Sequence, residues 1–195
     1  MSDAPRRVFV AGASGLIGVR LVPLFVGAGH VVAGLTRTPA KAERLAALGA
    51  EPFVADAFNR DEIARVVRAF SPDVVMHQLT DLPDDAAELP AYRDAHCRLL
   101  REGTHNLIDA AADARVVAQS IAWRADDETA GAYEELEATV LDSGGAVVRF
   151  GQFYGPGTYY ESELPDHPRI HIDTAARRAY EAMNAEGIVI ASDEL

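Results

Sequence analysis

The sequence has 195 residues, 49% hydrophobic and 25% charged, which is ordinary for a soluble domain with a full apolar core. Its formal net charge of −12 argues against a nucleic-acid or anionic-membrane surface, so we expect neither partner. The single cysteine, Cys97, excludes an intrachain disulfide and favours a reducing cytoplasm. We expect no signal peptide, because no long apolar run follows the basic pair within residues 1–7.

The hydrophobic pattern predicts strands and helices that alternate along the chain. Short apolar runs predict buried strands, in chain order at residues 7–11, 30–35, 51–55, 73–76, 115–120, 145–150, 170–172 and 188–191. Apolar residues at helical spacing predict helices at residues 15–28, 38–49, 60–70, 91–114, 133–142 and 173–184. The stretches 81–90 and 151–168 predict surface loops. The alternation favours an α/β fold, a Rossmann-type doubly wound parallel sheet with helices on both faces.

We divide the chain into two parts. Residues 1–150 form the predicted dinucleotide-binding Rossmann domain, and residues 151–195 form a short C-terminal extension that we interpret as a reduced substrate lobe. Such a reduced lobe leaves the cleft either open or completed by a second subunit. A homodimer is therefore a hypothesis that rests on this shortening alone.

A glycine-rich loop, Gly12-Ala13-Ser14-Gly15-Leu16-Ile17-Gly18, joins the first predicted strand to the first predicted helix. The first glycine permits the tight turn, the second lets the backbone approach a pyrophosphate, and the third lets helix and strand pack closely. The helix N-terminus offers unpaired N–H groups to the phosphates. The predicted cofactor contacts in this loop are Gly12, Ser14, Gly15, Leu16, Ile17 and Gly18.

The end of the second predicted strand indicates which dinucleotide is bound. NAD-specific domains place an acidic residue there, whereas this sequence reads Leu35-Thr36-Arg37-Thr38. The guanidinium of Arg37 matches the geometry of a 2′-phosphate, and Lys41 lies close enough in sequence to help. Asp56, after the third strand, stands where the adenine amine would lie. Arg37 and Asp56 can instead be simple surface residues. The pattern nevertheless favours NADP(H) over NAD(H).

These residues resemble the short-chain dehydrogenase/reductase superfamily, in its extended and atypical branch of NAD-dependent epimerase/dehydratase type. Asp56-Ala57 resembles the family's turn after the third strand, and residues 73–79 resemble its fourth strand and cofactor-facing turn. The resemblance implies cofactor contacts from Ala57 and Gln78. Later segments that resemble the family are residues 102–107, 149–157 and 170–173.

The catalytic residues that this resemblance implies are incomplete. The family pairs a Ser or Thr after the fifth strand with a Tyr and a Lys four residues later, so that hydride transfer is matched by proton transfer. Ser120 fits the first position, but no Tyr-x-x-x-Lys occurs and no lysine follows Lys41. Thr129 and Tyr133 fall at the positions of the Tyr and the Lys. Standard ketone/alcohol chemistry is therefore in doubt.

Four residues remain as candidate catalytic groups, each beside a structural interpretation. Ser120 can bond a substrate carbonyl or end a strand, and Tyr133 can be a displaced acid or a packed aromatic. Tyr154 can touch substrate or support its loop, and His77 can act as acid or base or bond neighbouring backbone. A carboxylate within residues 126–128 can be a base or part of a solvated loop. No metal site is expected, because the spacing is wrong at His96, His105, His167 and His171.

Three hypotheses for function follow. The first is an NADP(H)-dependent oxidoreductase or epimerase-type enzyme that acts on a small metabolite with a nonstandard proton donor. The second is a non-redox isomerase, cyclase or dehydratase, in which the cofactor is structural or absent. The third is a non-catalytic protein that senses NADP(H). The intact glycine loop favours those that keep the cofactor, and the missing Tyr and Lys favour the second and third.

Overall fold

Seven parallel strands form the main sheet of the computed structural model, which describes residues 4–193 and therefore only part of the opening segment 1–7. The strands lie in the spatial order β3-β2-β1-β4-β5-β6-β9, and β7 pairs with β8 in a separate two-stranded sheet. Their bounds are β1 Arg7–Ala11, β2 Val31–Thr36, β3 Glu51–Val54, β4 Val74–His77, β5 Arg115–Ile121, β6 Ala146–Phe150, β7 Gln152–Tyr154, β8 Arg169–His171 and β9 Gly187–Ala191.

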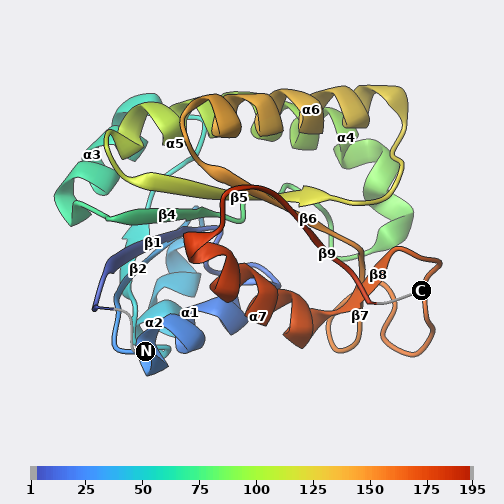
Figure 1. Ribbon diagram of the computed structural model, residues 1–195, viewed down its shortest axis with the longest axis horizontal. Coiled ribbons are helices and arrows are strands. Elements are labelled where there is room, and N and C mark those ends of the chain that lie inside the picture. The colour runs from blue at the N-terminus through green and yellow to red at the C-terminus, as the bar shows by residue number, and fades with distance from the viewer. Residues whose placement is uncertain (1–3, 194–195) are drawn as a thin grey trace.

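Helices cover both faces of this sheet, as Figure 1 shows. Helices α1, α2 and α7 lie on one face, and α3, α4, α5 and α6 lie on the other. Their bounds are α1 Gly18–Gly27, α2 Ala42–Ala47, α3 Arg60–Phe70, α4 Leu89–Arg98, α5 Thr104–Ala111, α6 Asp127–Asp142 and α7 Ile172–Glu181. Short turns of other helix types are η1 Pro39–Lys41, η2 Ala86–Glu88, η3 Leu99–Gly103 and η4 Ala182–Asn184. The predicted doubly wound α/β fold is confirmed.

The apolar strands are explained by burial on both faces. Along β1, Val8 and Val10 belong to the core beneath α1 and α7, whereas Phe9 and Ala11 belong to the core beneath α3 and α5. Because successive side chains of a strand point to opposite faces, a strand covered on both sides needs no polar position. The sequence pattern therefore identified the central strands well.

Helix α6 begins six residues before the predicted helix at 133–142. The side chain of Asp126 caps it by accepting from the backbone N–H of Thr129 at 3.2 Å, and Asp127 and Glu128 occupy the first turn. Acidic residues favour this position because they complement the positive end of the helix dipole. The acidic residues 126–128, predicted as part of a solvated loop, thus form the start of a helix.

Two predicted loops and one predicted helix cap were wrong. The loop predicted at 151–168 contains β7, and the segment predicted as surface loop at 81–90 contains a buried residue, Asp81, and the start of α4. The long helix predicted at 91–114 is present as one helical run over residues 89–111, in which the π-helical turn η3 joins α4 to α5. The side chain of His171, rather than Asp173 or Thr174, caps α7.

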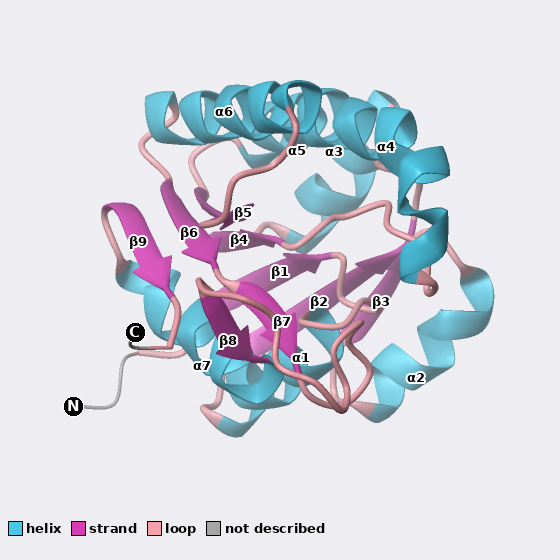
Figure 2. Ribbon diagram, turned by 90° about the vertical axis from the view of Figure 1, so that its right-hand side faces the viewer, coloured by secondary structure: helices cyan, strands magenta, loops and turns pink. Residues whose placement is uncertain are grey.

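The segment after residue 150 contributes to the same sheet and core as the rest of the chain. Strand β9 pairs with β6, and α7 packs beside α1. The small β7–β8 sheet stands in front of the main sheet in Figure 2, at the end of the molecule where the central strands finish.

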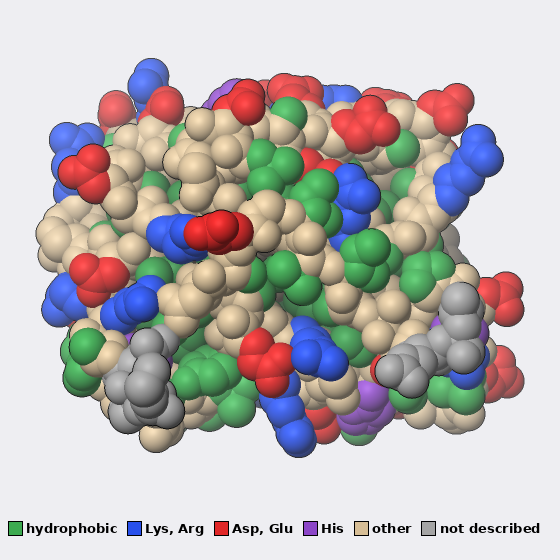
Figure 3. Space-filling model, in the orientation of Figure 1, with side chains coloured by type: hydrophobic (Ala, Val, Ile, Leu, Met, Phe, Trp, Pro, Cys, Tyr) green, Lys and Arg blue, Asp and Glu red, His purple; other side chains and the backbone are tan. Residues whose placement is uncertain are grey.

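The surface drawn in Figure 3 carries acidic and basic side chains interspersed, with no broad basic field on that face. Within residues 4–193, no helix has both the length and the apolar character required to cross a bilayer.

Candidate functional site

The glycine loop lies at the point where the strand order of the sheet reverses. Strand β1 has β2 on one side and β4 on the other, so the segments that follow β1 and β4 diverge at their carboxyl ends. Gly12 follows β1 with a positive φ of +85°, and a Cβ there would collide with the backbone carbonyl of Gln78. The N–H of Gln78 donates to the Ala11 carbonyl at 2.8 Å. Open α/β sheets bind ligands at such a crevice.

The start of α1 is built for an anion. The N–H groups of Leu16 and Ile17 make no backbone hydrogen bond in the described residues 4–193. Gly15 is exposed, so a ligand can approach its backbone. Gly18 is buried, and a Cβ there would collide with the Gly12 carbonyl and Ala13. Free N–H groups at a helix N-terminus and a bare backbone suit a pyrophosphate.

Gln78 supplies an independent observation at the same place. Its side chain is 5% exposed, yet neither its amide nitrogen nor its amide oxygen has a hydrogen-bond partner among the described residues. A buried amide without partners is costly, and a ligand with both donor and acceptor groups would satisfy it. The glycine loop, the start of α1 and the unpaired Gln78 amide therefore fit a dinucleotide.

Arg37 follows β2 and leaves most of its guanidinium exposed. Its Nη2 lies 2.7 Å from Oδ1 of Asp81, in the segment after β4, and this bond raises the pKa of Arg37. At the end of β2, the hydroxyl of Thr36 lies 3.1 Å from the hydroxyl of Ser14 in the glycine loop. These contacts fix the end of β2 beside the glycine loop.

Asp56 and Ala57 follow β3, at the same end of the sheet. One carboxylate oxygen of Asp56 accepts from the N–H of Phe58 at 3.0 Å. The carbonyl of Ala57 accepts from the side-chain amide of Asn106 at 2.9 Å, which ties this turn to α5. The predicted cofactor residues thus stand on consecutive segments after β1, β2, β3 and β4.

A loop from the C-terminal part of the chain lies beside the glycine loop. Arg20 in α1 donates to the Pro156 carbonyl at 2.7 Å and to Asp173 at 2.9 Å. The hydroxyl of Tyr159 donates to the Pro83 carbonyl at 2.5 Å, in the segment after β4. The segment Tyr154-Gly155-Pro156-Gly157 therefore lies beside the start of α1.

His77 is fully buried and both of its ring nitrogens are engaged. The hydroxyl of Thr104 donates to the Leu100 carbonyl, so its oxygen accepts from Nε2–H of His77 at 2.8 Å. Nδ1 of His77 accepts from the N–H of Leu79. Burial lowers the pKa of His77 to about 4, so the imidazole is neutral at pH 7.

Ser120 faces α6 within a buried polar cluster. Its hydroxyl donates to Glu137 at 2.5 Å, and Arg149 donates to the same carboxylate through Nε and Nη2. Burial opposes ionisation of Glu137, but the hydrogen bonds from Arg149 and Ser120 outweigh it and lower the pKa. The hydroxyl proton of Ser120 is thus engaged in a hydrogen bond to the Glu137 carboxylate.

Tyr133 and Tyr154 are each bonded to a different partner. His96 accepts from the N–H of Asp81 through Nδ1, so its Nε2–H donates to the Tyr133 oxygen at 3.1 Å. Burial raises the pKa of Tyr133 well above its usual range. Tyr154, which is half-buried, donates to Asp193 at 2.8 Å, and this hydrogen bond raises its pKa.

The structure brings the predicted cofactor residues together but gives the four candidate catalytic residues separate surroundings. No hydrogen bond within residues 4–193 joins any two of His77, Ser120, Tyr133 and Tyr154. Sequence reasoning missed their partners, which are Thr104, Glu137, His96 and Asp193. None of these partners is close in sequence to the residue that it contacts, so the local pattern could not identify them.

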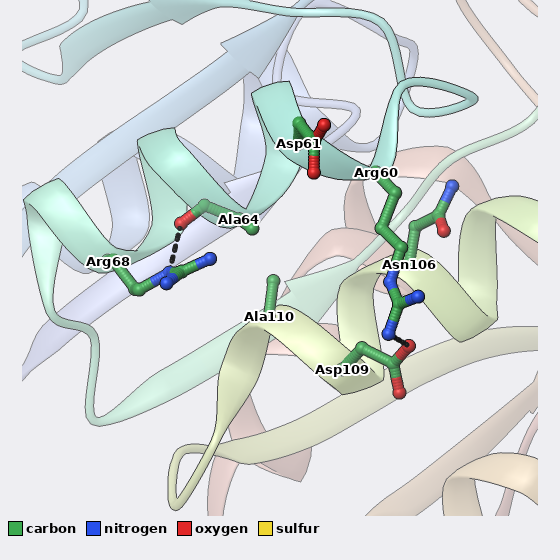
Figure 4. A pocket seen from close by; sticks show the side chains of 7 residues that line it. All are labelled: Arg60, Asp61, Ala64, Arg68, Asn106, Asp109 and Ala110. Atoms are coloured by element: carbon green, nitrogen blue, oxygen red, sulfur yellow. Dashed lines mark hydrogen bonds and ion pairs between the residues drawn. The ribbon is translucent and has the colours of Figure 1, made fainter.

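A pocket of about 240 Å³ lies elsewhere, between α3 and α5. Figure 4 shows Arg60 reaching across to Asp109, while Arg68 bonds the Ala64 carbonyl of its own helix. None of the predicted site residues lines this pocket, and two of its charged residues, Arg60 and Asp109, pair with each other. The glycine loop therefore remains the candidate functional site.

Comparison with known proteins identifies the family of the chain. The sequence matches the NAD(P)H-binding family over residues 12–147. A curated relative, 3-diazoavenalumate denitrifying reductase from Streptomyces sp, is 39% identical over 184 residues, which cover 79% of this chain and 58% of the relative. The chain thus spans a little over half of that relative's length.

Solved structures share the fold. UDP-glucose 4-epimerase from Thermus thermophilus, in complex with NAD, has a TM-score of 0.76 at 18% identity, covering 95% of this chain and 77% of that chain. The enzyme WbmH from Bordetella bronchiseptica, in complex with NAD+, has a TM-score of 0.77 at 15% identity, covering 97% of this chain and 76% of that chain.

Proposed function

This chain belongs to the NAD(P)H-binding family, and from that premise we propose that it is an NADP(H)-dependent reductase of a small molecule. The proposal adds two points to the family assignment. The first is the preference for a 2′-phosphorylated cofactor. The second is a reduction that needs no proton from the protein.

The cofactor preference rests on one observation, the exposed guanidinium of Arg37 at the end of β2. Its side chain is 63% exposed, and no carboxylate follows β2 directly to bind the ribose hydroxyls of NAD. Guanidinium binds phosphate through paired N–H groups, and it stays charged at every physiological pH. Gly12, Gly15, Gly18, the start of α1 and Gln78 would hold the rest of the dinucleotide.

The second point rests on the surroundings of the candidate acids. Ser120 and Tyr154 each donate to a carboxylate, and His77 is neutral with both nitrogens engaged. Tyr133 keeps its proton, because burial raises its pKa. A reaction that puts negative charge on a substrate oxygen needs a ready proton donor, so this arrangement favours a reaction that creates no such charge.

Replacement of a diazonium group by hydride meets that requirement, and the relative at 39% identity is named as a denitrifying reductase of a diazo compound. The bound dinucleotide would supply a hydride. A hydride that replaces a diazonium group forms a carbon–hydrogen bond, and the carbon–nitrogen bond breaks with its electron pair moving onto nitrogen. Dinitrogen leaves as a neutral molecule, so the charges balance without a proton. We therefore propose a diazonium compound, which carries the positive charge that the hydride neutralises, as the substrate class.

The test uses the full chain, NADPH deuterated at the transferred position, and an arenediazonium carboxylate. We expect protein-dependent release of dinitrogen and a product with deuterium at the carbon that lost nitrogen, detected by mass spectrometry. The reaction without protein and the Gly15→Asp variant, which places charge against the pyrophosphate, are the controls. Tyr154→Phe should keep the rate within about twofold, since no proton is required. A large loss in Tyr154→Phe, or turnover of ketones only, would contradict the proposal.

A further inference from the structure

The partner of Arg37 is an unusual carboxylate. Asp81 lies in a polar, acidic segment that the sequence marks as surface, yet it is only 8% exposed. Burying an ionised carboxylate is unfavourable unless it is paired. Its side chain pairs with Arg37 at 2.7 Å, and its backbone N–H donates to Nδ1 of His96 at 3.3 Å. Asp81 is therefore fixed at both its backbone and its side chain.

Arg37 is held by this carboxylate at one point only. A guanidinium has five N–H donors, and within residues 4–193 a single nitrogen of Arg37 bonds another side chain. The Arg37 side chain as a whole is 63% exposed, so a ligand can reach it from solvent. An exposed arginine normally loses much side-chain freedom when it binds a ligand, and a residue that holds it beforehand reduces that loss.

We propose that Asp81 is the positioning residue that sets the preference for NADP(H), because it holds the Arg37 guanidinium ready for the adenosine 2′-phosphate. This inference rests on the proposed role of Arg37. Asp81 also carries a negative charge that repels phosphate. That charge is already paired with Arg37, and its effect on a solvated phosphate is screened by water and salt. Positioning is therefore the larger effect.

The charge and the positioning roles can be separated by the choice of substitution. Asp81→Ala removes both the charge and the hydrogen-bond acceptor. Asp81→Asn removes the charge but keeps an oxygen that can accept from Arg37. Asp84→Ala is the matched control, because Asp84 lies in the same segment, is exposed, and carries the same charge.

The experiment is calorimetric titration of the full chain with 2′,5′-ADP and with 5′-ADP, which differ only in the 2′-phosphate. We expect Asp81→Ala to weaken 2′,5′-ADP about tenfold and 5′-ADP less than about twofold. Asp81→Asn should lose less than about threefold, and Asp84→Ala should match the unsubstituted protein. In an Arg37→Ala background, Asp81→Ala should change nothing further.

The outcomes separate this inference from the proposed function. If the unsubstituted protein binds both nucleotides equally, the role of Arg37 fails and this inference fails with it. If it prefers 2′,5′-ADP but Asp81→Ala keeps that preference, or if Asp81→Asn binds 2′,5′-ADP more tightly, only the role of Asp81 is overturned. Should Asp81→Ala not fold, as judged by thermal unfolding, the comparison of Asp81→Asn with Asp84→Ala decides the matter.

Discussion

Two buried histidines should make the stability of this protein depend on pH between 7 and 5. Burial lowers the pKa of both His77 and His96 from 6.5 to about 4. Between pH 6.5 and pH 4, each of these histidines is protonated in the unfolded chain but remains neutral in the folded chain. The contribution of the neutral histidines to the free energy of unfolding is therefore fully present above pH 6.5 and is lost as the pH decreases toward 4. Each histidine lowers the free energy of unfolding by about 3 kcal/mol over the whole interval, or by about 1.4 kcal/mol per pH unit within it.

The assay is denaturant unfolding at pH 7, 6 and 5, a range that lies above the titration of most carboxylates. We expect the free energy of unfolding to fall by roughly 2–3 kcal/mol per pH unit below pH 6. His77→Gln and His96→Gln should each remove about half of that slope, whatever they do to the stability at pH 7. His105→Gln, at an exposed position, controls for the loss of a histidine. A flat profile, or a slope that neither substitution changes, would refute the assignment of neutral buried imidazoles.

Three further substitutions test the packing around the site. Gly12→Ala should destabilise the fold by about 2 kcal/mol and abolish NADPH binding. The control is Gly27→Ala, which should be neutral or stabilising because a Cβ there meets nothing within 4 Å. Thermal unfolding measures the stability of each variant, and calorimetry measures its NADPH binding. Glu137→Gln should cost about 1–2 kcal/mol in denaturant unfolding, because Arg149 loses its carboxylate partner. Ser120→Ala should cost about 1 kcal/mol and leave the reductase rate unchanged in the NADPH assay, and a lost rate would restore Ser120 as a catalytic group.

The parts of the site that sequence predicted are those set by local pattern. The glycine loop was identified because a buried strand precedes it and a helix follows it, and Arg37 because it ends the next strand. Each inference needs only neighbouring residues and the known direction of parallel strands. The same holds for the central strands, whose apolar runs follow from burial on both faces.

The parts that sequence missed depend on contacts between distant segments. Arg37 and Asp81 are 44 positions apart, and nothing near Asp81 marks it as buried. The early start of α6 was missed because Gly131 and an acidic run resemble a loop, although Asp126 caps the helix. The pairing of β7 with β8 joins residues that are 17 positions apart across an irregular segment.

The central claim is that this chain binds NADP(H) at the glycine loop through Arg37. The most direct measurement is calorimetric titration of the protein and its Arg37→Glu variant with NADPH and NADH. We expect micromolar binding of NADPH, weaker binding of NADH, and a loss in Arg37→Glu that is at least about tenfold larger for NADPH. No binding of either dinucleotide, or equal losses for both in the variant, would contradict it.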